Sequence, residues 1–74
     1  MDFRMAFPGG KKTISTDSLE DAGAQLANVV KALGYPTGLF GDLAPHAASR
    51  LQSNGGHYEY RVGYGRWVAV TEIA

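Results

Sequence analysis

Residues 57–73, HYEYRVGYGRWVAVTEI, decide the fold because they predict a β-hairpin rich in aromatic side chains. The segment contains three of the four tyrosines and the only tryptophan of the chain. Both halves are rich in β-branched and aromatic residues, which favour strands, and the Gly63-Tyr64-Gly65 sequence between them is typical of a turn. In so short a chain, such a hairpin is expected to build the core, to bind a partner, or to do both.

Two registers are open to this hairpin. If Gly65 takes the left-handed conformation of a three-residue loop with a bulge, Tyr60 pairs with Val68. Arg61 then lies opposite Trp67 on the outer face, where a cation–π contact is expected. A two-residue turn would shift the pairing by one residue and reverse every side chain. We favour the first register because it gathers the tyrosines and valines on one face.

Two further strands are predicted within residues 1–7 and 11–16, because apolar and polar residues alternate in the first of them. The glycines of Gly9-Gly10 supply the positive φ that a two-residue turn requires, so we place the turn there. The pairs that this turn implies are Phe7 with Lys12 and Met5 with Ile14. This register puts Ile14 on the same face as the apolar side chains of the first strand.

Two helices are predicted between the hairpins. In the first, about 18–33, apolar residues recur at three- and four-residue steps, Asp17 is the expected N-cap and Gly34 the expected terminator. A shorter helix, about 43–53, is expected to begin at the capping residue Asp42. The order β-β-α-α-β-β predicts one α+β domain over residues 1–74, with a four-stranded antiparallel sheet and the helices packed on one face.

Composition narrows the classes of function. Seven Lys and Arg balance seven Asp and Glu, and tight nonspecific binding of nucleic acid usually needs a basic surplus. The acids are spread along the chain, at Asp2, Asp17, Glu20, Asp21, Asp42, Glu59 and Glu72.

The absence of cysteine excludes disulfides, and a core this small makes a homodimer plausible. With no apolar signal-peptide core near Met1 and no membrane-spanning stretch, we expect a soluble, cytoplasmic protein.

The sequence carries no pattern that predicts catalysis or a cofactor. His46 and His57 do not have the spacing of a metal site, and none of the serines lies in a Gly-x-Ser-x-Gly elbow. The 9–13 segment lacks the first glycine and the Ser/Thr position of a phosphate-binding P-loop, and a hairpin turn explains it. Gly63-x-Gly65 lacks the third glycine of a dinucleotide fingerprint. We therefore expect a protein that is not an enzyme and has no metal or cofactor.

One short resemblance concerns the first half of the chain. Phe7-Pro8, Thr13 and the 17–22 sequence DSLEDA are similar to the Phe-Pro, Thr and Asp-Thr-Leu-Glu-Glu-Ala run of HicB-like antitoxins. The similarity covers under a quarter of the chain, its loop is one residue shorter, and the family's Leu-Pro-Gly segment is absent. The sequence after Gly34 departs from the family, so we infer no membership.

The remaining hypothesis is a small protein-binding module, an inhibitor or regulator of a larger complex of the anti-defence type carried by phages and mobile elements. Tyr, Trp and Arg dominate the energetics of protein interfaces, which favours this interpretation. The alternative is a small nucleic-acid-binding protein that stacks bases on its C-terminal hairpin. The residues predicted to bind the partner are Arg61, Tyr64, Arg66 and Trp67 in the hairpin, Leu39 and Phe40 in the 35–41 loop, and Lys11 and Lys12 in the first hairpin.

Overall fold

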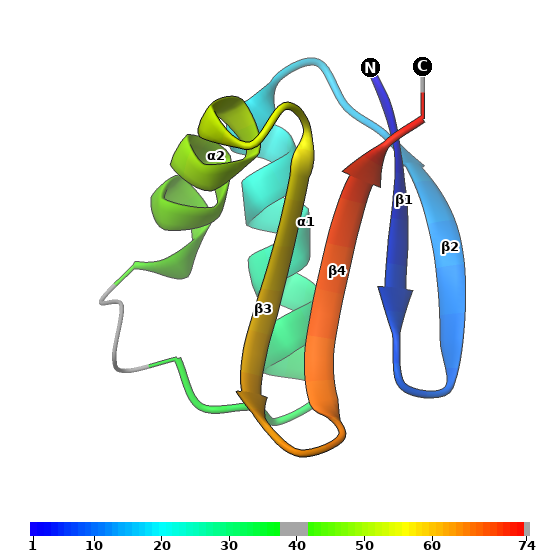
Figure 1. Cartoon of the computed structure of the whole chain (residues 1–74), viewed down its shortest axis with the longest axis vertical. Helices are drawn as coiled ribbons and strands as arrows, with labels where there is room; N and C mark the ends of the chain where they lie inside the picture. The colour runs from blue at the N-terminus through cyan, green and yellow to red at the C-terminus, as the bar shows by residue number, and fades with distance from the viewer. Residues whose placement is uncertain (38–41, 74) are drawn as a thin grey trace.

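The computed structural model describes residues 1–37 and 42–73, which form a single antiparallel sheet with two helices on one face (Figure 1). The predicted α+β class and the order β-β-α-α-β-β are confirmed. The elements are β1 (Asp2–Phe7), β2 (Gly10–Ser15), α1 (Leu19–Ala32), α2 (Leu43–Ser53), β3 (His57–Gly63) and β4 (Arg66–Glu72). The strand order β2-β1-β4-β3 leaves β2 and β3 at the two edges.

The two hairpins are joined by pairing between β1 and β4, the first and last strands of the chain. Met5 lies opposite Val70 in this central pair, and the Ile73 N–H donates to the Asp2 carbonyl oxygen at 3.0 Å. The side chains of Met5 and Val70 are fully buried beneath the helices. The core is therefore built where the two ends of the sequence meet.

The C-terminal hairpin adopts the favoured strand register, but the predicted three-residue loop is wrong, because Gly63 pairs with Arg66 across a two-residue turn at Tyr64-Gly65. Gly65 has a φ of 74°, Tyr60 lies opposite Val68, and Arg61 lies opposite Trp67, with the register shift of a bulge just after Arg61. Val68 is fully buried and Trp67 is half-buried. The prediction that this register gathers tyrosines and valines on the core face is confirmed for the four that are buried, Tyr58, Tyr60, Val68 and Val70.

The predicted turn of the first hairpin is wrong by one position. The structure turns at Pro8-Gly9, with a φ of 101° at Gly9, whereas Gly10 already belongs to β2. Proline followed by a glycine of positive φ suits the two central positions of a type II turn, which explains the choice. The pairs are therefore Phe7 with Gly10, Met5 with Lys12 and Phe3 with Ile14. Since the pairing moves by two residues, Ile14 keeps its predicted face and is buried.

Both helices begin and end on local signals. The N-cap of α1 is Ser18 rather than the predicted Asp17, because the Ser18 hydroxyl accepts from the Asp21 N–H at 3.1 Å. At the other end, Gly34 has a φ of 78° and donates to the Lys31 carbonyl, which closes a Schellman-type cap. Asp42 caps α2 as predicted, by accepting from the Ala44 N–H at 3.2 Å.

The two helices touch backbone to backbone at Gly23. This glycine is buried, and a Cβ built on it would overlap the Ala44 carbonyl oxygen and lie 3.0 Å from the Ala48 nitrogen. Only a residue without a side chain permits this approach. It seats α2 close enough for Leu43 and Leu51 to join the core.

We predict that Gly23→Ala destabilises the protein by about 1–3 kcal/mol, the usual cost of overpacking, although alanine is the better helix former. Urea unfolding measures the change. Asn28→Ala, at an exposed position of α1, is the matched control and is expected to leave stability unchanged or slightly higher. A Gly23→Ala variant as stable as the wild type would contradict the close helix contact.

The unpaired edges of β2 and β3 lead to a prediction about oligomeric state. Edge strands offer free backbone N–H and C=O groups, and so small a core gains stability from association. We expect a homodimer at micromolar concentration, measured by light scattering. The monomer mass persisting up to millimolar concentration would refute it.

Candidate functional site

The molecule has two ends of different character, because its strands and helices run along one common direction (Figure 1). The turn end carries the Pro8-Gly9 turn, the Tyr64-Gly65 turn and the C-terminus of α1. The other end, which we call the terminal end, carries the start of β1, the end of β4, the N-terminus of α1 and the C-terminus of α2. The two ends collect different side chains.

Most of the positive charge lies in the half of the molecule near the turn end. Five of the seven cations belong to it: Lys11, Lys12, Lys31, Arg61 and Arg66. Two carboxylates share this half, and both have partners: Asp42 caps α2, and Glu59 forms an ion pair with Arg61 at 3.3 Å. Five cations against two carboxylates leave a surplus of three positive charges.

The half near the terminal end has the opposite balance. Its acids are Asp2, Asp17, Glu20, Asp21 and Glu72, and its cations are Arg4 and Arg50. The surplus here is three negative charges, so the zero net charge of the chain conceals a separation of charge along its length. The acids are spread along the sequence, but five of the seven lie in this half of the folded chain.

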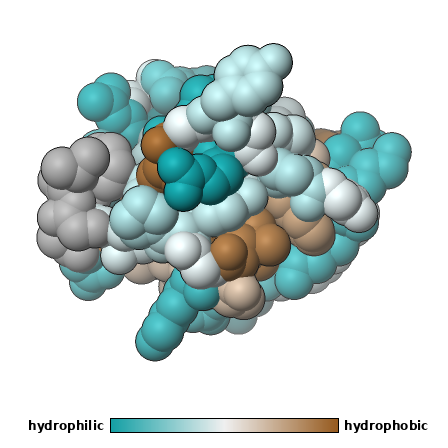
Figure 2. Space-filling view, turned by 90° about the horizontal axis from the view of Figure 1, so that it is seen from below, coloured by the Kyte–Doolittle hydropathy of each residue, from teal (hydrophilic) through white to brown (hydrophobic). Residues whose placement is uncertain are grey.

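Apolar side chains are exposed at the turn end. Tyr64 is fully exposed at the tip of the hairpin, and Leu33, just after α1, keeps 38% of its surface in contact with solvent. Val29 is half-buried one turn before Leu33. Looking onto this end, Figure 2 shows a compact apolar area surrounded by polar side chains. We call the residues Lys12, Val29, Leu33, Tyr64 and Arg66 the turn-end surface.

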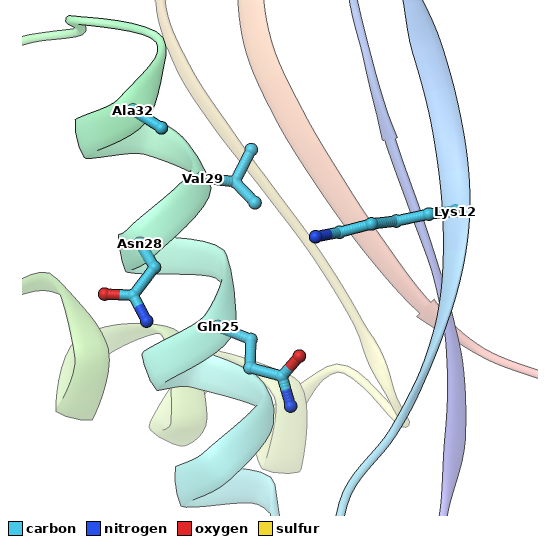
Figure 3. A pocket seen from close by; sticks show the side chains of 5 residues that line it. All are labelled: Lys12, Gln25, Asn28, Val29 and Ala32. Atoms are coloured by element: carbon cyan, nitrogen blue, oxygen red, sulfur yellow. The ribbon is translucent and has the colours of Figure 1, made fainter.

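A shallow groove of about 300 Å³ extends this surface between α1 and the edge strand β2. It exists because α1 packs on β4 and α2 on β3, so neither helix packs closely on β2. Figure 3 shows the Lys12 side chain reaching from β2 toward α1, with Val29 pointing toward it from the helix. Gln25, Asn28 and Ala32 complete the lining. The groove is open, and polar and apolar side chains share its lining, which suits a contact with a macromolecule better than enclosure of a small ligand.

The structure distributes the predicted partner-binding residues unevenly. Tyr64 and Arg66 lie together at the hairpin tip. Lys11 and Lys12 point to opposite faces of the sheet, since side chains alternate along β2, and only Lys12 lines the groove. Leu39 and Phe40 lie outside the described residues.

The expected cation–π contact between Arg61 and Trp67 is wrong, although their pairing on the outer sheet face is right. The Arg61 guanidinium forms its ion pair with Glu59 instead, at 3.3 Å, and among the described residues it makes no ring contact. A carboxylate two residues away on the same face competes for the cation more strongly than an aromatic ring does. Because the Arg61 guanidinium is already paired with Glu59, it is less available for a phosphate contact.

Leu33 and Val29 are the surface residues that sequence reasoning missed. Their three- and four-residue spacing places them in the apolar stripe of α1, which assigns both to the core. The structure leaves both side chains partly exposed to solvent. The apolar stripe continues to the last turn of α1, and on the side of α1 that faces β2 no other described element packs closely against it. Their position in the last turns before the Gly34 terminator could have indicated this exposure, since side chains at the end of a helix are less often covered by other elements.

Two of the hairpin tyrosines belong to the core. Tyr58 and Tyr60 are buried, and the Tyr60 hydroxyl donates to the Pro36 carbonyl, which ties the segment after α1 to β3. Burial raises the pKa of the Tyr60 phenol above its ordinary value of 10.0. Burial also raises the pKa of the Tyr58 phenol, and the electrostatic effect of the neighbouring Tyr60 raises it further.

The histidines lie in unrelated surroundings. The His57 ring is 2.8 Å from the Thr71 hydroxyl, and the His46 ring meets the edge of Tyr58 with centroids 5.8 Å apart. Within residues 1–37 and 42–73, no group of three His, Cys, Asp or Glu side chains could hold a metal ion. Neither described helix is long and apolar enough to cross a membrane.

Comparison with known proteins finds no family model, no curated protein and no solved structure that matches this chain. Function is therefore inferred from the turn-end surface and its charges.

The buried tyrosines generate a prediction about alkaline pH. A phenol with a higher pKa in the folded chain holds its proton more tightly there, so its contribution is complete below about pH 10 and is lost as pH rises through the folded-state pKa. Tyr60→Phe should make the fall in unfolding free energy between about pH 9 and about pH 11 shallower. Urea unfolding at several pH values measures this slope. Tyr64→Phe, at the exposed turn, is the control, and equal slopes in the two variants would show that Tyr60 is not involved.

Proposed function

We propose that this protein is a non-enzymatic protein-binding module, which acts in the cytoplasm as a stoichiometric inhibitor or regulator of a larger complex. The anti-defence proteins of phages and mobile elements are the class that we propose. A small protein of this kind acts by covering a surface, so each target requires one bound copy. Its partner would meet the turn-end surface.

The observation that carries this proposal is the exposed apolar surface near the turn end, in the half of the molecule that holds most of the cations. Tyr64 and Leu33 expose apolar atoms there, and Lys12 and Arg66 are exposed in the same half. An apolar centre with a polar rim is the usual anatomy of a protein interface, and Tyr and Arg are enriched among its strongest contacts.

Nucleic-acid binding is the second candidate, and the collection of cations near the turn end favours it. A single-strand stacking surface also needs several exposed aromatic rings. Tyr58 and Tyr60 are buried and Trp67 is half-buried, which leaves Tyr64 as the one fully exposed aromatic residue among those described. The hairpin is therefore a poorer platform for bases than its sequence suggests.

Capture from a host lysate, followed by mass spectrometry, tests the proposal with two matched variants. Leu33→Ser changes the turn-end surface and should weaken capture roughly tenfold, as expected for an interface contact. Ile73→Ser changes a side chain of similar exposure, 43% against 38%, at the terminal end and should leave capture unchanged. Both should keep the stability of the wild type within about 0.5 kcal/mol.

Two results would contradict the proposal. One is a wild-type protein that retains no partner in a one-to-one ratio. The other is retention of nucleic acid in place of protein, with binding to oligonucleotides at ~150 mM salt, where phosphate contacts are already weakened.

A further inference from the structure

We propose that the partner presents an acidic protein surface to the turn-end surface, an inference that rests on the proposed function. The first reason is the separation of charge: a surplus of three positive charges near the turn end faces away from a surplus of three negative charges near the terminal end. Such a distribution orients the molecule in the field of a charged partner and accelerates productive encounters. An acidic partner would be met by the turn end first.

The second reason is that the cations of this surface are available. Within the part of the chain that the structure describes, Lys12, Lys31 and Arg66 form no ion pair, whereas Arg61 is already paired with Glu59. Lys12 and Arg66 are exposed. No carboxylate among the described residues pairs with these charges, so they are available to the carboxylates of a partner.

Gly63 helps to place one of these cations. A Cβ on Gly63 would lie 3.1 Å from the Arg66 Nη2 atom, so the guanidinium lies back along the hairpin over a position that has no side chain. This brings the Arg66 charge back over Gly63, the residue that precedes the exposed Tyr64 in the chain. A tyrosine and a guanidinium in one turn are suited to contact an apolar side chain and a carboxylate of the same partner.

The apolar side chains of the turn-end surface favour an acidic protein over nucleic acid as the partner. The phosphate backbone of a duplex offers charge without apolar side chains, and it would leave Leu33 and Val29 without a counterpart. An acidic protein surface supplies carboxylates for the cations and apolar atoms for the centre. A second copy of this chain, through its acidic terminal end, is the other possible source of carboxylates and is distinguished in the test.

The test uses two double variants that remove the same charge. Lys12→Gln with Arg66→Gln neutralises two exposed cations of the turn-end surface, and Arg4→Gln with Arg50→Gln neutralises two exposed cations near the terminal end. Both pairs change the net charge equally, so a difference between them reports position alone. Poly-L-glutamate serves as the acidic polypeptide probe and a 20-base-pair DNA duplex as the nucleic-acid probe, with backbone amide shifts followed by NMR.

We expect poly-L-glutamate to shift the amides of residues 9–13, 29–34 and 63–67 in the wild type. The Lys12/Arg66 variant should bind it roughly tenfold more weakly, and the Arg4/Arg50 variant less than about twofold more weakly. Shifts spread over the whole molecule, or equal losses in the two variants, would overturn the inference. Tighter binding to the duplex than to poly-L-glutamate would overturn it in favour of nucleic acid.

The lysate experiment with the same variants separates this inference from the proposed function. If the wild type captures a protein partner that the Lys12/Arg66 variant retains equally well, the acidic partner is refuted while the protein-binding function stands. If the wild type captures no protein, the function itself fails. A dimer in light scattering that the Lys12/Arg66 variant dissociates would assign the turn-end surface to a second copy and would also overturn the inference.

Discussion

The backbone contact between α1 and α2 at Gly23 is the constraint on which the rest of the structure depends. Because no side chain separates the helices there, α2 lies close enough to α1 to cover β3 and to place Leu43 and Leu51 in the core. A chain of 74 residues buries a small fraction of its surface compared with larger domains, so it depends strongly on the seating of each apolar side chain. The absence of a side chain at Gly23, where the two helices touch, therefore determines how the helical layer lies on the sheet.

The seating of the helices also creates the surface to which we assign function. With α1 over β4 and α2 over β3, the edge strand β2 keeps a groove beside α1 that Lys12 and Val29 line (Figure 3). The last turn of α1 extends its apolar stripe past the covered region and leaves Leu33 exposed. The same packing that completes the core on one side thus leaves an incomplete layer on the other, and a partner can complete it.

The cations of the chain gather near the turn end because of the direction in which the elements run. Every strand and helix runs between the same two ends, so residues distant in the sequence gather by the direction of their elements rather than by their order. Lys12 lies in the first half of β2, Lys31 lies in the last turn of α1 and Arg66 begins β4, so all three belong to the half near the turn end. The acids of the α1 N-terminus lie at the opposite end, where they also suit the helix dipole.

The sequence by itself determined the local structure of this protein. The positive φ of Gly65, the Asp42 cap and the Gly34 terminator are set by neighbouring residues, and the alternation of apolar side chains indicates the core face of the strands. Errors were also local: Ser18 replaced Asp17 as the cap because both are good capping residues, and Pro8-Gly9 formed the first turn because two adjacent glycines left its position ambiguous. Of the predicted site, Tyr64, Arg66 and Lys12 belong to the turn-end surface.

Only the tertiary structure decided which charges face the same way and which apolar residues stay uncovered. Net charge and spacing contain no information about the relative direction of elements, so a chain with balanced charges gave no sign of its separated ends. The stripe of α1 likewise could not reveal that Leu33 lies beyond the layer that covers its neighbours, because coverage depends on where α2 and β2 lie in space. Periodicity is a property of one element, whereas exposure is a property of the elements packed around it.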